Sequence, residues 1–252
     1  MRALAVHRAE TGVGPVAVAL DRGARHYRAM RLLQPSQLPA AAEIARHYHR
    51  EPYATVVLTG AYEEAGDVGR MAARAGEVLL HAPFSAHRDR ISAQRTVVLD
   101  LPLPFDGRDW PARARIADPD RIVRLAERDP VEAVAALLSD LAPTLAAEEE
   151  DLPDQLSAAL RTSASPRIGE WAAARGRSRE HVARSFEKLY GVTPAAYRAD
   201  CQAKRAWRMI VGSGDGLAGI AVEAGYADQA HMTRAVTGLT GMSPRRWRVA
   251  VR

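Results

Sequence analysis

The chain contains very little cysteine and lysine, and it has no long apolar run. Its 252 residues include one cysteine, Cys201, which excludes an internal disulfide and a zinc site built from several cysteines. No stretch approaches the roughly 18 unbroken apolar residues of a membrane-spanning helix. The first fifteen residues lack the apolar core and small-residue cleavage site of a signal peptide. We therefore expect a cytoplasmic protein with no membrane partner.

Charge is distributed unevenly along a chain that is long enough for two domains. Hydrophobic residues make up 47% of the sequence, which is typical of a folded protein. Residues 152–252 hold 16 Lys and Arg against 8 Asp and Glu, whereas residues 1–151 hold 19 against 22. A basic C-terminal segment beside a mildly acidic N-terminal segment indicates that the C-terminal part meets a polyanion.

The N-terminal part shows short apolar segments separated by glycine and proline. Segments 53–62, 76–83 and 96–104 are predicted strands, and EEAGDVG (63–69) is predicted to be a polar turn. Several short strands at this spacing favour a sandwich or a barrel. Prolines and a glycine between 102 and 111 then mark a boundary.

From Asp118 the apolar periodicity becomes helical. An apolar stripe follows Pro130, formed by Val131, Val134, Leu137, Leu138 and Leu141. Such a stripe either packs on the core of its own chain or forms a dimer surface, and the sequence leaves both alternatives open.

The C-terminal part carries one pattern twice. The copies are IGEWAAARG (168–176) followed by SREHVARSFEKLYG (178–191), and LAGIAVEAG (217–225) followed by DQAHMTRAVTGLTG (228–241). In each copy a short helix is predicted to end at Gly176 or Gly225, and Ser178 or Asp228 is predicted to cap the next helix. Helix, tight turn and helix form the architecture of a DNA-binding helix-turn-helix.

The second helix of each copy has an apolar face and a polar face. The polar faces combine Arg, Gln and Thr, which hydrogen-bond the edges of DNA bases. The candidate DNA contacts are Arg179, Glu180 and Arg184 in the first copy, Gln229, Thr233 and Arg234 in the second, and Arg245 and Arg246 just beyond it. For Arg184 and Arg234 the alternative is a salt bridge within the domain, and for the last two arginines it is a solvated basic tail.

The segment AGYADQAHMTRAVTGLTGMSPRRWR (224–248), with the fainter upstream copy and the helix between them, resembles the DNA-binding domain of the AraC family of transcription regulators. The resemblance covers about the last hundred residues, and it implies two recognition helices in successive major grooves on one side of the duplex. It places the base-contacting positions of the first helix at Glu180, Ala183 and Arg184, and those of the second at Gln229, Thr233 and Arg234. This sequence departs from the family at Gly238, and glycine inside a helix costs roughly 1 kcal/mol relative to alanine.

Two N-terminal segments, HYHREPYATVVLTG (47–60) and GEVLLHAPFSAHRD (76–89), resemble the two cupin motifs in their spacing. This implies a cupin-like barrel in which His47, His49 and His87 bind an effector. Three imidazoles would also suit a divalent first-row metal, but Glu51 lies too close to His49 to be the usual cupin glutamate. Whether these histidines bind a metal therefore stays open.

Together these patterns predict a multi-domain α+β protein. It has an N-terminal cupin-like β-barrel as sensor (1–105), a helical linker with a dimerisation role (106–151), and an all-α C-terminal domain with two helix-turn-helix units (152–252). We expect a sequence-specific transcription regulator that responds to a small molecule and has no catalytic residues and no cofactor. Its expected partners are double-stranded promoter DNA, a small-molecule effector, RNA polymerase and a second copy of the chain.

Two other functions compete with this expectation. One is a metal-dependent cupin enzyme with a nucleic-acid-binding C-terminal domain, which needs a complete metal site. The other is a DNA alkylation sensor. That chemistry needs cysteine thiolates, which Cys201 in the helix between the two copies does not supply.

Overall fold

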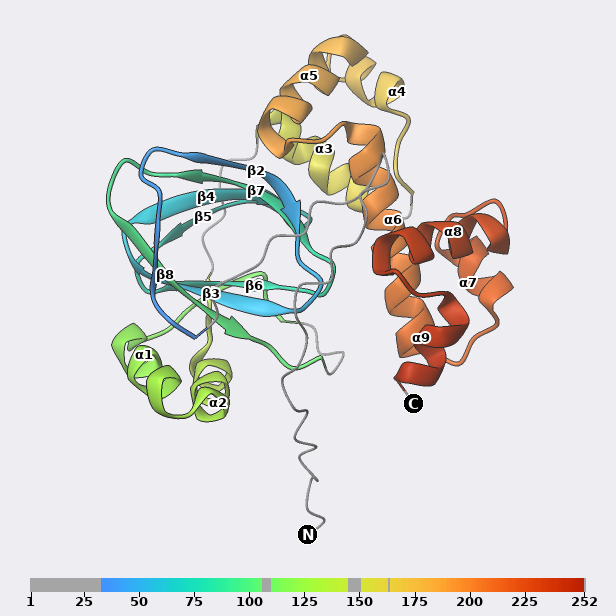
Figure 1. Ribbon diagram of the computed structural model, residues 1–252. Coiled ribbons are helices and arrows are strands. Elements are labelled where there is room, and N and C mark those ends of the chain that lie inside the picture. Colours follow the sequence, from blue (N-terminus) through green and yellow to red (C-terminus); the bar gives the residue numbers. More distant parts are fainter. Residues whose placement is uncertain (1–32, 106–109, 145–150, 163, 252) are drawn as a thin grey trace.

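The computed structural model describes residues 33–105, 110–144, 151–162 and 164–251. They form a β-rich domain followed by a helical region (Figure 1). The first fifteen residues, in which we predict no signal peptide, lie outside the described residues. No helix in the described part is long and apolar enough to cross a membrane.

The β-rich domain consists of two antiparallel sheets. One has the strand order β1-β8-β3-β6-β9-β10 and the other β2-β7-β4-β5. The strands are β1 (Ser36–Leu38), β2 (Glu43–Tyr48), β3 (Tyr53–Thr59), β4 (Ala61–Gly66), β5 (Gly69–Arg74), β6 (Glu77–His81), β7 (Ala86–Ile91), β8 (Thr96–Pro102), β9 (Arg113–Arg115) and β10 (Ala142–Pro143). The two sheets face each other as a sandwich around the core, which agrees with the predicted β-rich N-terminal domain.

The sequence of strand β3 is almost continuously apolar because both of its faces are covered. Val57 belongs to the cluster between the sheets, whereas its neighbour Val56 packs with the helices on the outer face. Because successive side chains of a strand point to opposite faces, a strand covered on both sides needs apolar residues throughout. The predicted strands at β3, β6 and β8 are confirmed. The turn predicted over residues 63–69 is wrong for its first residues, since β4 continues through Glu64 and pairs with β5 and β7.

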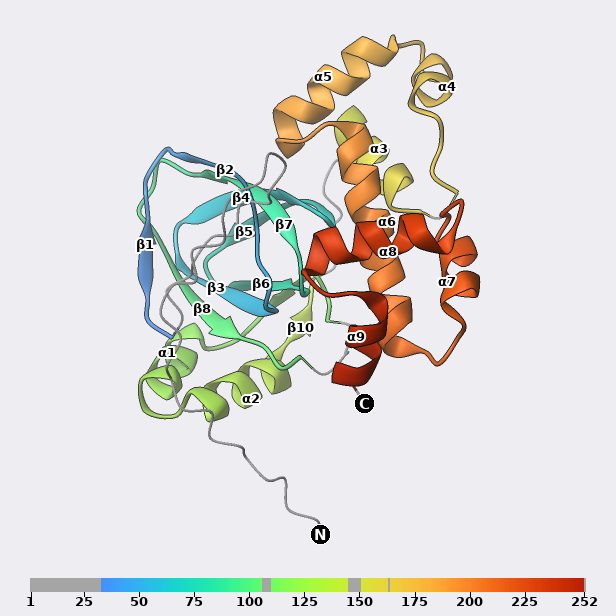
Figure 2. The same cartoon turned by 45° about the vertical axis from the view of Figure 1, so that its right-hand side comes forward.

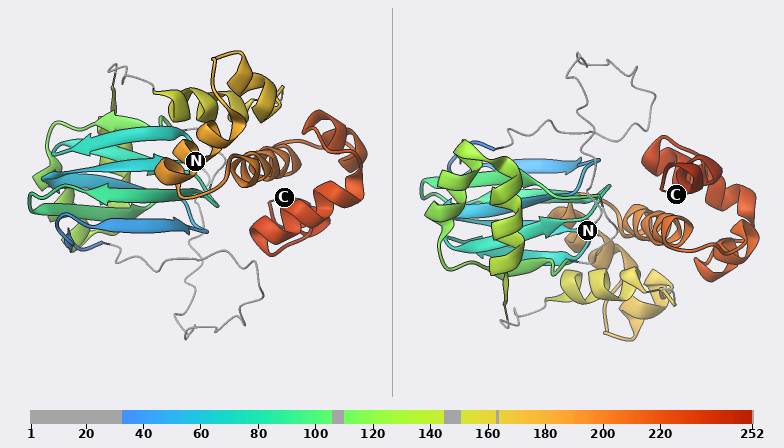
Figure 3. Two further views of the ribbon diagram at one scale, coloured as in Figure 1. Left: turned by 90° about the horizontal axis from the view of Figure 1, so that it is seen from above. Right: turned by 90° about the horizontal axis from the view of Figure 1, so that it is seen from below.

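Helices α1 (Pro119–Arg128) and α2 (Pro130–Asp140) cover the outer face of the six-stranded sheet (Figure 3). Each begins after an aspartate whose side chain accepts from backbone N–H groups, Asp118 and Asp129. Leu137 is fully buried, whereas Val131 at the start of α2 is 79% exposed. The apolar stripe of α2 therefore packs mainly on its own sheet, and β9 and β10 on either side join that sheet.

The helical region contains two subdomains joined by the long helix α6 (Figure 2). Its helices are α3 (Leu152–Arg161), α4 (Ile168–Ala173), α5 (Arg179–Tyr190), α6 (Pro194–Gly212), α7 (Leu217–Glu223), α8 (Gln229–Thr240) and α9 (Pro244–Ala250). One apolar cluster holds α3, α4 and α5 together around Phe186, and another holds α7, α8 and α9 around Trp207.

The repeated pattern folds in the same way in both copies. Gly176 and Gly225 have φ angles of +64° and +83°, a left-handed conformation that glycine adopts without a steric penalty. Ser178 accepts a hydrogen bond from the His181 N–H, and Asp228 accepts one from the His231 N–H. Both predicted helix-turn-helix units are thus present, from their turns to their caps.

Candidate DNA-binding surface and sensor cavity

Helices α5 and α8 each bury one face in their subdomain and leave the other face outward. Val182 and Phe186 on α5 are buried, as are Met232 and Val236 on α8. The predicted base-contacting side chains lie on the opposite faces. Arg179, Glu180, Arg184, Gln229 and Arg234 are exposed, while Ala183 and Thr233 are half-buried. Both faces are therefore accessible to a large partner.

In the described part of the chain, the arginines on these faces have no ion-pair partner that would hold them away from DNA. Within it, no ion pair includes Arg184 or Arg234, so the salt-bridge alternative finds no support there. Arg245 and Arg246 are exposed in the first turn of α9. Arg248, in contrast, donates to the backbone carbonyl of Asp215 and is held inside the domain.

A cavity of about 520 Å³ opens in the β domain. His47, His49 and His87 line it together with Tyr53 and Asp89. The ring centroids of the three histidines lie 4.4 to 5.1 Å apart. The structure therefore brings the three predicted effector-binding residues together in a space that is large enough for a small ligand.

Glu64 and His81, which the sequence did not single out, extend this group into the core. His81 Nε2 lies 2.9 Å from Glu64 Oε2, and His87 Nδ1 lies 3.3 Å from the same oxygen and 2.7 Å from Asp89 Oδ1. The composition of residues 63–69 predicts a turn at Glu64. Reading residues 61–66 as a strand would have put Glu64 on the inner face beside Tyr62, because side chains two apart share a face.

The charges of this group stabilise one another. Burial alone would raise the pKa of Glu64, but His81 and His87 lower it to about 2. Burial alone would lower the pKa of His87, but Glu64 and Asp89 raise it to about 9. At neutral pH the site thus holds a carboxylate and an imidazolium in direct contact.

Residues 171–250 match a family model described as a helix-turn-helix domain. The match begins inside α4 and ends with α9, so it includes both α5 and α8. The C-terminal part is an AraC-type helix-turn-helix DNA-binding domain. The resemblance stated for this region is confirmed. A search of curated protein sequences finds no match.

Solved structures that resemble this chain include the following three. ToxT from Vibrio cholerae with a bound unsaturated fatty acid is 8% identical over 85% of this chain and 93% of that chain, with a TM-score of 0.37. The DNA-binding domain of AdpA in complex with a target DNA is 23% identical over 41% and 95%, with a TM-score of 0.38. A transcriptional regulator with an AraC-type domain from Chromobacterium violaceum is 18% identical over 37% and 83%, with a TM-score of 0.34. At these values the likenesses transfer no ligand and no site to this chain.

The DNA-binding domain and the β-rich domain in front of it make the chain a DNA-binding transcription regulator. The two domains are in contact at both helical subdomains. Ala65 at the end of β4 belongs to the apolar cluster around Phe186, and Phe84 in the β6–β7 turn belongs to the cluster around Trp207. Each half of the DNA-binding domain therefore includes one β-domain residue in its core.

Asp67 in the β4–β5 turn is the polar centre of this interface. Its carboxylate accepts from Arg46 of β2 at 2.8 Å and from the ammonium of Lys204 on α6. Burial alone would raise the pKa of Asp67, but Lys204 and Arg46 lower it. Close by, Tyr48 donates to Asp200 at 2.5 Å, and Tyr197 donates to the Gly66 carbonyl at 3.1 Å.

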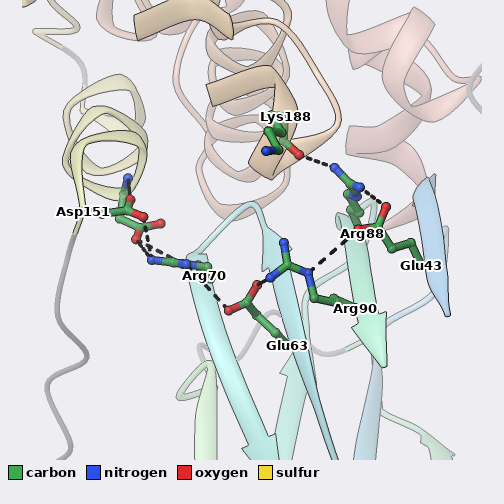
Figure 4. A network of polar contacts seen from close by, with 8 residues as sticks. Glu43, Glu63, Arg70, Arg88, Arg90, Asp151 and Lys188 are labelled. Atoms are coloured by element: carbon green, nitrogen blue, oxygen red, sulfur yellow. Dashed lines mark hydrogen bonds and ion pairs between the residues drawn. The ribbon is translucent and has the colours of Figure 1, made fainter. Parts of the chain in front are cut away.

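A second polar network follows the edge of the interface (Figure 4). Arg70 of β5 pairs with Asp154 at 2.6 Å and with Asp151 at 3.0 Å, and Arg88 of β7 donates to the Lys188 carbonyl at the end of α5. Glu43, Glu63 and Arg90 connect the two arginines across the sheet. Apart from the pair of Arg70 with the buried Asp154, these ion pairs are partly or largely exposed, and such pairs contribute about 0–1 kcal/mol each.

Phe84 packs against the second subdomain in a strained conformation. Its φ angle is +60°, which is uncommon for a bulky residue. The ring lies edge-on to Trp207 and Trp247, with centroids 5.1 and 5.8 Å away. Strain of this size costs of order 1–3 kcal/mol and persists where the surrounding packing requires it.

Proposed function

We propose that this regulator binds promoter DNA sequence-specifically through α5 and α8, and that a small molecule in the β-domain cavity controls the binding. One observation carries the proposal. The domain that contains a ligand-sized cavity also contributes a core residue to each half of the DNA-binding domain, and both recognition faces stay exposed.

The residue types on the two faces suggest different roles. Arg184 and Arg234 suit guanine, Gln229 suits adenine, and Thr233 suits several bases. Glu180 accepts from cytosine N4 or repels phosphate. Ala183 has no hydrogen-bonding group, so we expect the first helix to specify fewer positions than the second.

Other basic residues are proposed to bind the DNA backbone. Arg179 is the first residue of α5, and Arg245 and Arg246 lie in the first turn of α9. Helix N-termini also offer backbone N–H groups to phosphate. These contacts fix the position of the protein on the duplex without reading its sequence.

The proposed effector is a polar small molecule, because the cavity is lined by hydrogen-bonding side chains. His47, His49 and His87 offer ring nitrogens, and Tyr53 and Asp89 offer oxygens. A ligand that binds one interdomain arrangement more tightly than another shifts the population between the two. We propose that it acts on the contacts at Asp67 and Phe84.

The remaining expectations belong to the same proposal. The chain acts in the cytoplasm as a regulator without enzymatic activity, and it contacts RNA polymerase. A homodimer would use the helical part of residues 106–151, where Val131 is exposed. The DNA-binding domain begins at about residue 152. Burial raises the pKa of the Cys201 thiol to about 12, which suits a packed residue and not a reactive one.

Selection of binding sites from random duplexes, followed by sequencing, tests the proposal on the full chain. We expect the wild-type chain to enrich one motif with two separated conserved blocks. Arg184→Ala and Arg234→Ala should each relax a different block. Arg128→Ala on α1 is the matched control, since it removes an exposed arginine of the β domain and should leave the motif unchanged. If no motif is enriched, the proposal is wrong.

A further inference from the structure

Glu64, His81 and His87 bring three donor atoms together between the two sheets. Glu64 and His87 come from β4 and β7 of the four-stranded sheet, whereas His81 ends β6 of the six-stranded sheet. The three side chains are 2 to 7% exposed. The site is thus built from both layers of the sandwich.

The distances are close to those of a coordination sphere. Glu64 Oε2 lies 2.9 Å from His81 Nε2 and 3.3 Å from His87 Nδ1. Around a tetrahedral ion with bonds of about 2.0–2.1 Å, neighbouring donor atoms lie roughly 3.3 Å apart. Small side-chain shifts would therefore suffice to admit an ion.

The surroundings orient His87 for such a role. Its Nε2 lies 2.9 Å from the Tyr53 hydroxyl, which leaves Nδ1 directed at the carboxylates of Glu64 and Asp89. Partners on the far ring nitrogen are typical of metal-binding histidines, because they fix the ring. The Tyr53 ring also stacks on His81 at a centroid distance of 4.1 Å.

His81 contacts this group through one ring nitrogen. Its Nε2 faces the Glu64 carboxylate, whereas its Nδ1 is buried and has no hydrogen-bond partner within the described residues. Nε2 is therefore the nitrogen that would bind an ion, which leaves the ring proton on Nδ1.

We propose that Glu64, His81 and His87 bind one divalent transition-metal ion of the zinc class. Two imidazoles and one carboxylate form a donor set that such ions accept, and the carboxylate offsets part of the ion's charge. This site is distinct from the His47 and His49 side of the cavity, because neither Glu64 nor His81 lines that cavity. His87 belongs to both.

The site would have a structural consequence for the interdomain contact. His81 and His87 lie on either side of the β6–β7 turn that presents Phe84 to the second subdomain. An ion bound to both histidines would fix the two ends of that turn. The ion therefore stabilises the strained conformation of Phe84 in the docked arrangement.

Metal titration of the full chain tests this inference without any assay of DNA binding. Chelator-treated protein is titrated with Zn²⁺ against a chromophoric competitor, and with Co²⁺ while its visible absorption is recorded. We expect one ion per chain and a four-coordinate Co²⁺ spectrum. Glu64→Gln and His81→Asn should each weaken binding at least tenfold.

Two further variants make the result specific. Glu63→Gln changes the neighbouring carboxylate, which pairs with Arg70 and Arg90 at the sheet surface, and should bind Zn²⁺ like the wild type. His47→Ala should also keep its affinity. No bound ion in the wild type would overturn the inference, and so would a site that depends on His47 but not on Glu64 or His81. Circular dichroism confirms that each variant is folded, and the wild-type titration decides the question even if one is not.

Discussion

The ammonium of Lys204 on the helix between the two DNA-binding subdomains donates to the carboxylate of Asp67 in the β4–β5 turn. The chain has only two lysines among its 35 basic residues, and this one is 4% exposed. A buried ion pair stabilises a structure only when its charges remain matched. Asp67 pairs with both Lys204 and Arg46, so one carboxylate balances two buried positive charges at the interface.

Asp67→Ala should destabilise the docked arrangement by about 3–5 kcal/mol, because it leaves two buried cations without their partner. Urea unfolding at pH 7 measures the loss. Limited proteolysis, which detects separation of the domains, shows whether that loss lies at the interface.

Glu43→Gln is the control for the loss of a carboxylate. Glu43 also pairs with an interface arginine, Arg88, but its side chain is 55% exposed. The change should cost no more than about 1 kcal/mol. Equal losses in the two variants would show that burial of the Asp67 pair adds nothing.

The sequence predicted the elements that depend on local pattern. Glycine turns, helix caps and alternating apolar residues located both helix-turn-helix units and the strands β3, β6 and β8. Asp67 and Glu64 were missed, because EEAGDVG has the composition of a turn, and its strand pairs not only with the adjacent β5 but also with residues more than 20 positions away along β7. No local pattern specifies such a pairing.

The same reason limits the prediction of the site. His47, His49 and His87 could be grouped from their spacing, since a known motif fixes it. His81 and Lys204 could not, because each acquires its role from a partner in a distant element, Glu64 in β4 and Asp67 in the β4–β5 turn.

Stability should depend on pH through the buried pair of Glu64 and His87. In the unfolded chain His87 loses its proton near pH 6.5, but in the folded chain it keeps the proton up to about pH 9. Its stabilisation is therefore complete below pH 6.5 and is lost as the pH rises through 9. Glu64 acts in the opposite direction, since its contribution is complete above pH 4.5 and is lost as the pH falls towards 2.

Each shift corresponds to at most about 3 kcal/mol, and the two largely describe one interaction and do not add. The measurement is chemical unfolding of the full chain in EDTA from pH 3 to 10. His87→Gln should lose the decline between pH 6.5 and 9, although Glu64, Asp89 and Arg46 still surround that position. A decline of the same size in this variant would assign it to another group.

Phe84→Ala should weaken the docking of the second DNA-binding subdomain. Removing a buried aromatic ring costs about 3–5 kcal/mol, and relief of the positive φ angle does not restore it, since alanine is also strained there. Tryptophan fluorescence reports the change, because Trp207 is 5% exposed and should shift its emission to the red.

Phe105→Ala is the matched control for Phe84. Phe105 also contacts Trp247, stacked at a centroid distance of 6.1 Å, but it is 43% exposed. Its removal should shift the emission less and cost less stability. Equal effects would mean that the buried position of Phe84 between Trp207 and Trp247 contributes no more to docking than an exposed aromatic contact does.

Gly238→Ala should stabilise the second recognition helix by about 1 kcal/mol. Gly238 lies inside α8 with no positive φ angle, and an added Cβ would meet nothing within 4 Å. Gly241→Ala is the opposite case, since Gly241 ends the helix at φ +76° and alanine is strained there. Thermal unfolding should give a raised Tm for the first variant and a lowered Tm for the second, and a lowered Tm for both would contradict the open environment at Gly238.

Arg234→Ala and Arg246→Ala should separate base reading from backbone binding. Arg234 is exposed on the outward face of α8, and its loss should cost about 1–3 kcal/mol on the selected site while relaxing the preference at one position. Arg246 lies in α9, and its loss should weaken binding to all duplexes alike and lower the slope of log K against log salt by about 1.

Affinities for the selected site and for single-base variants, each measured at several salt concentrations, distinguish the two variants. An Arg234→Ala protein that keeps the full sequence preference would remove this residue from the base-contacting set, whereas a change of preference in Arg246→Ala would place α9 in a groove and not on the backbone.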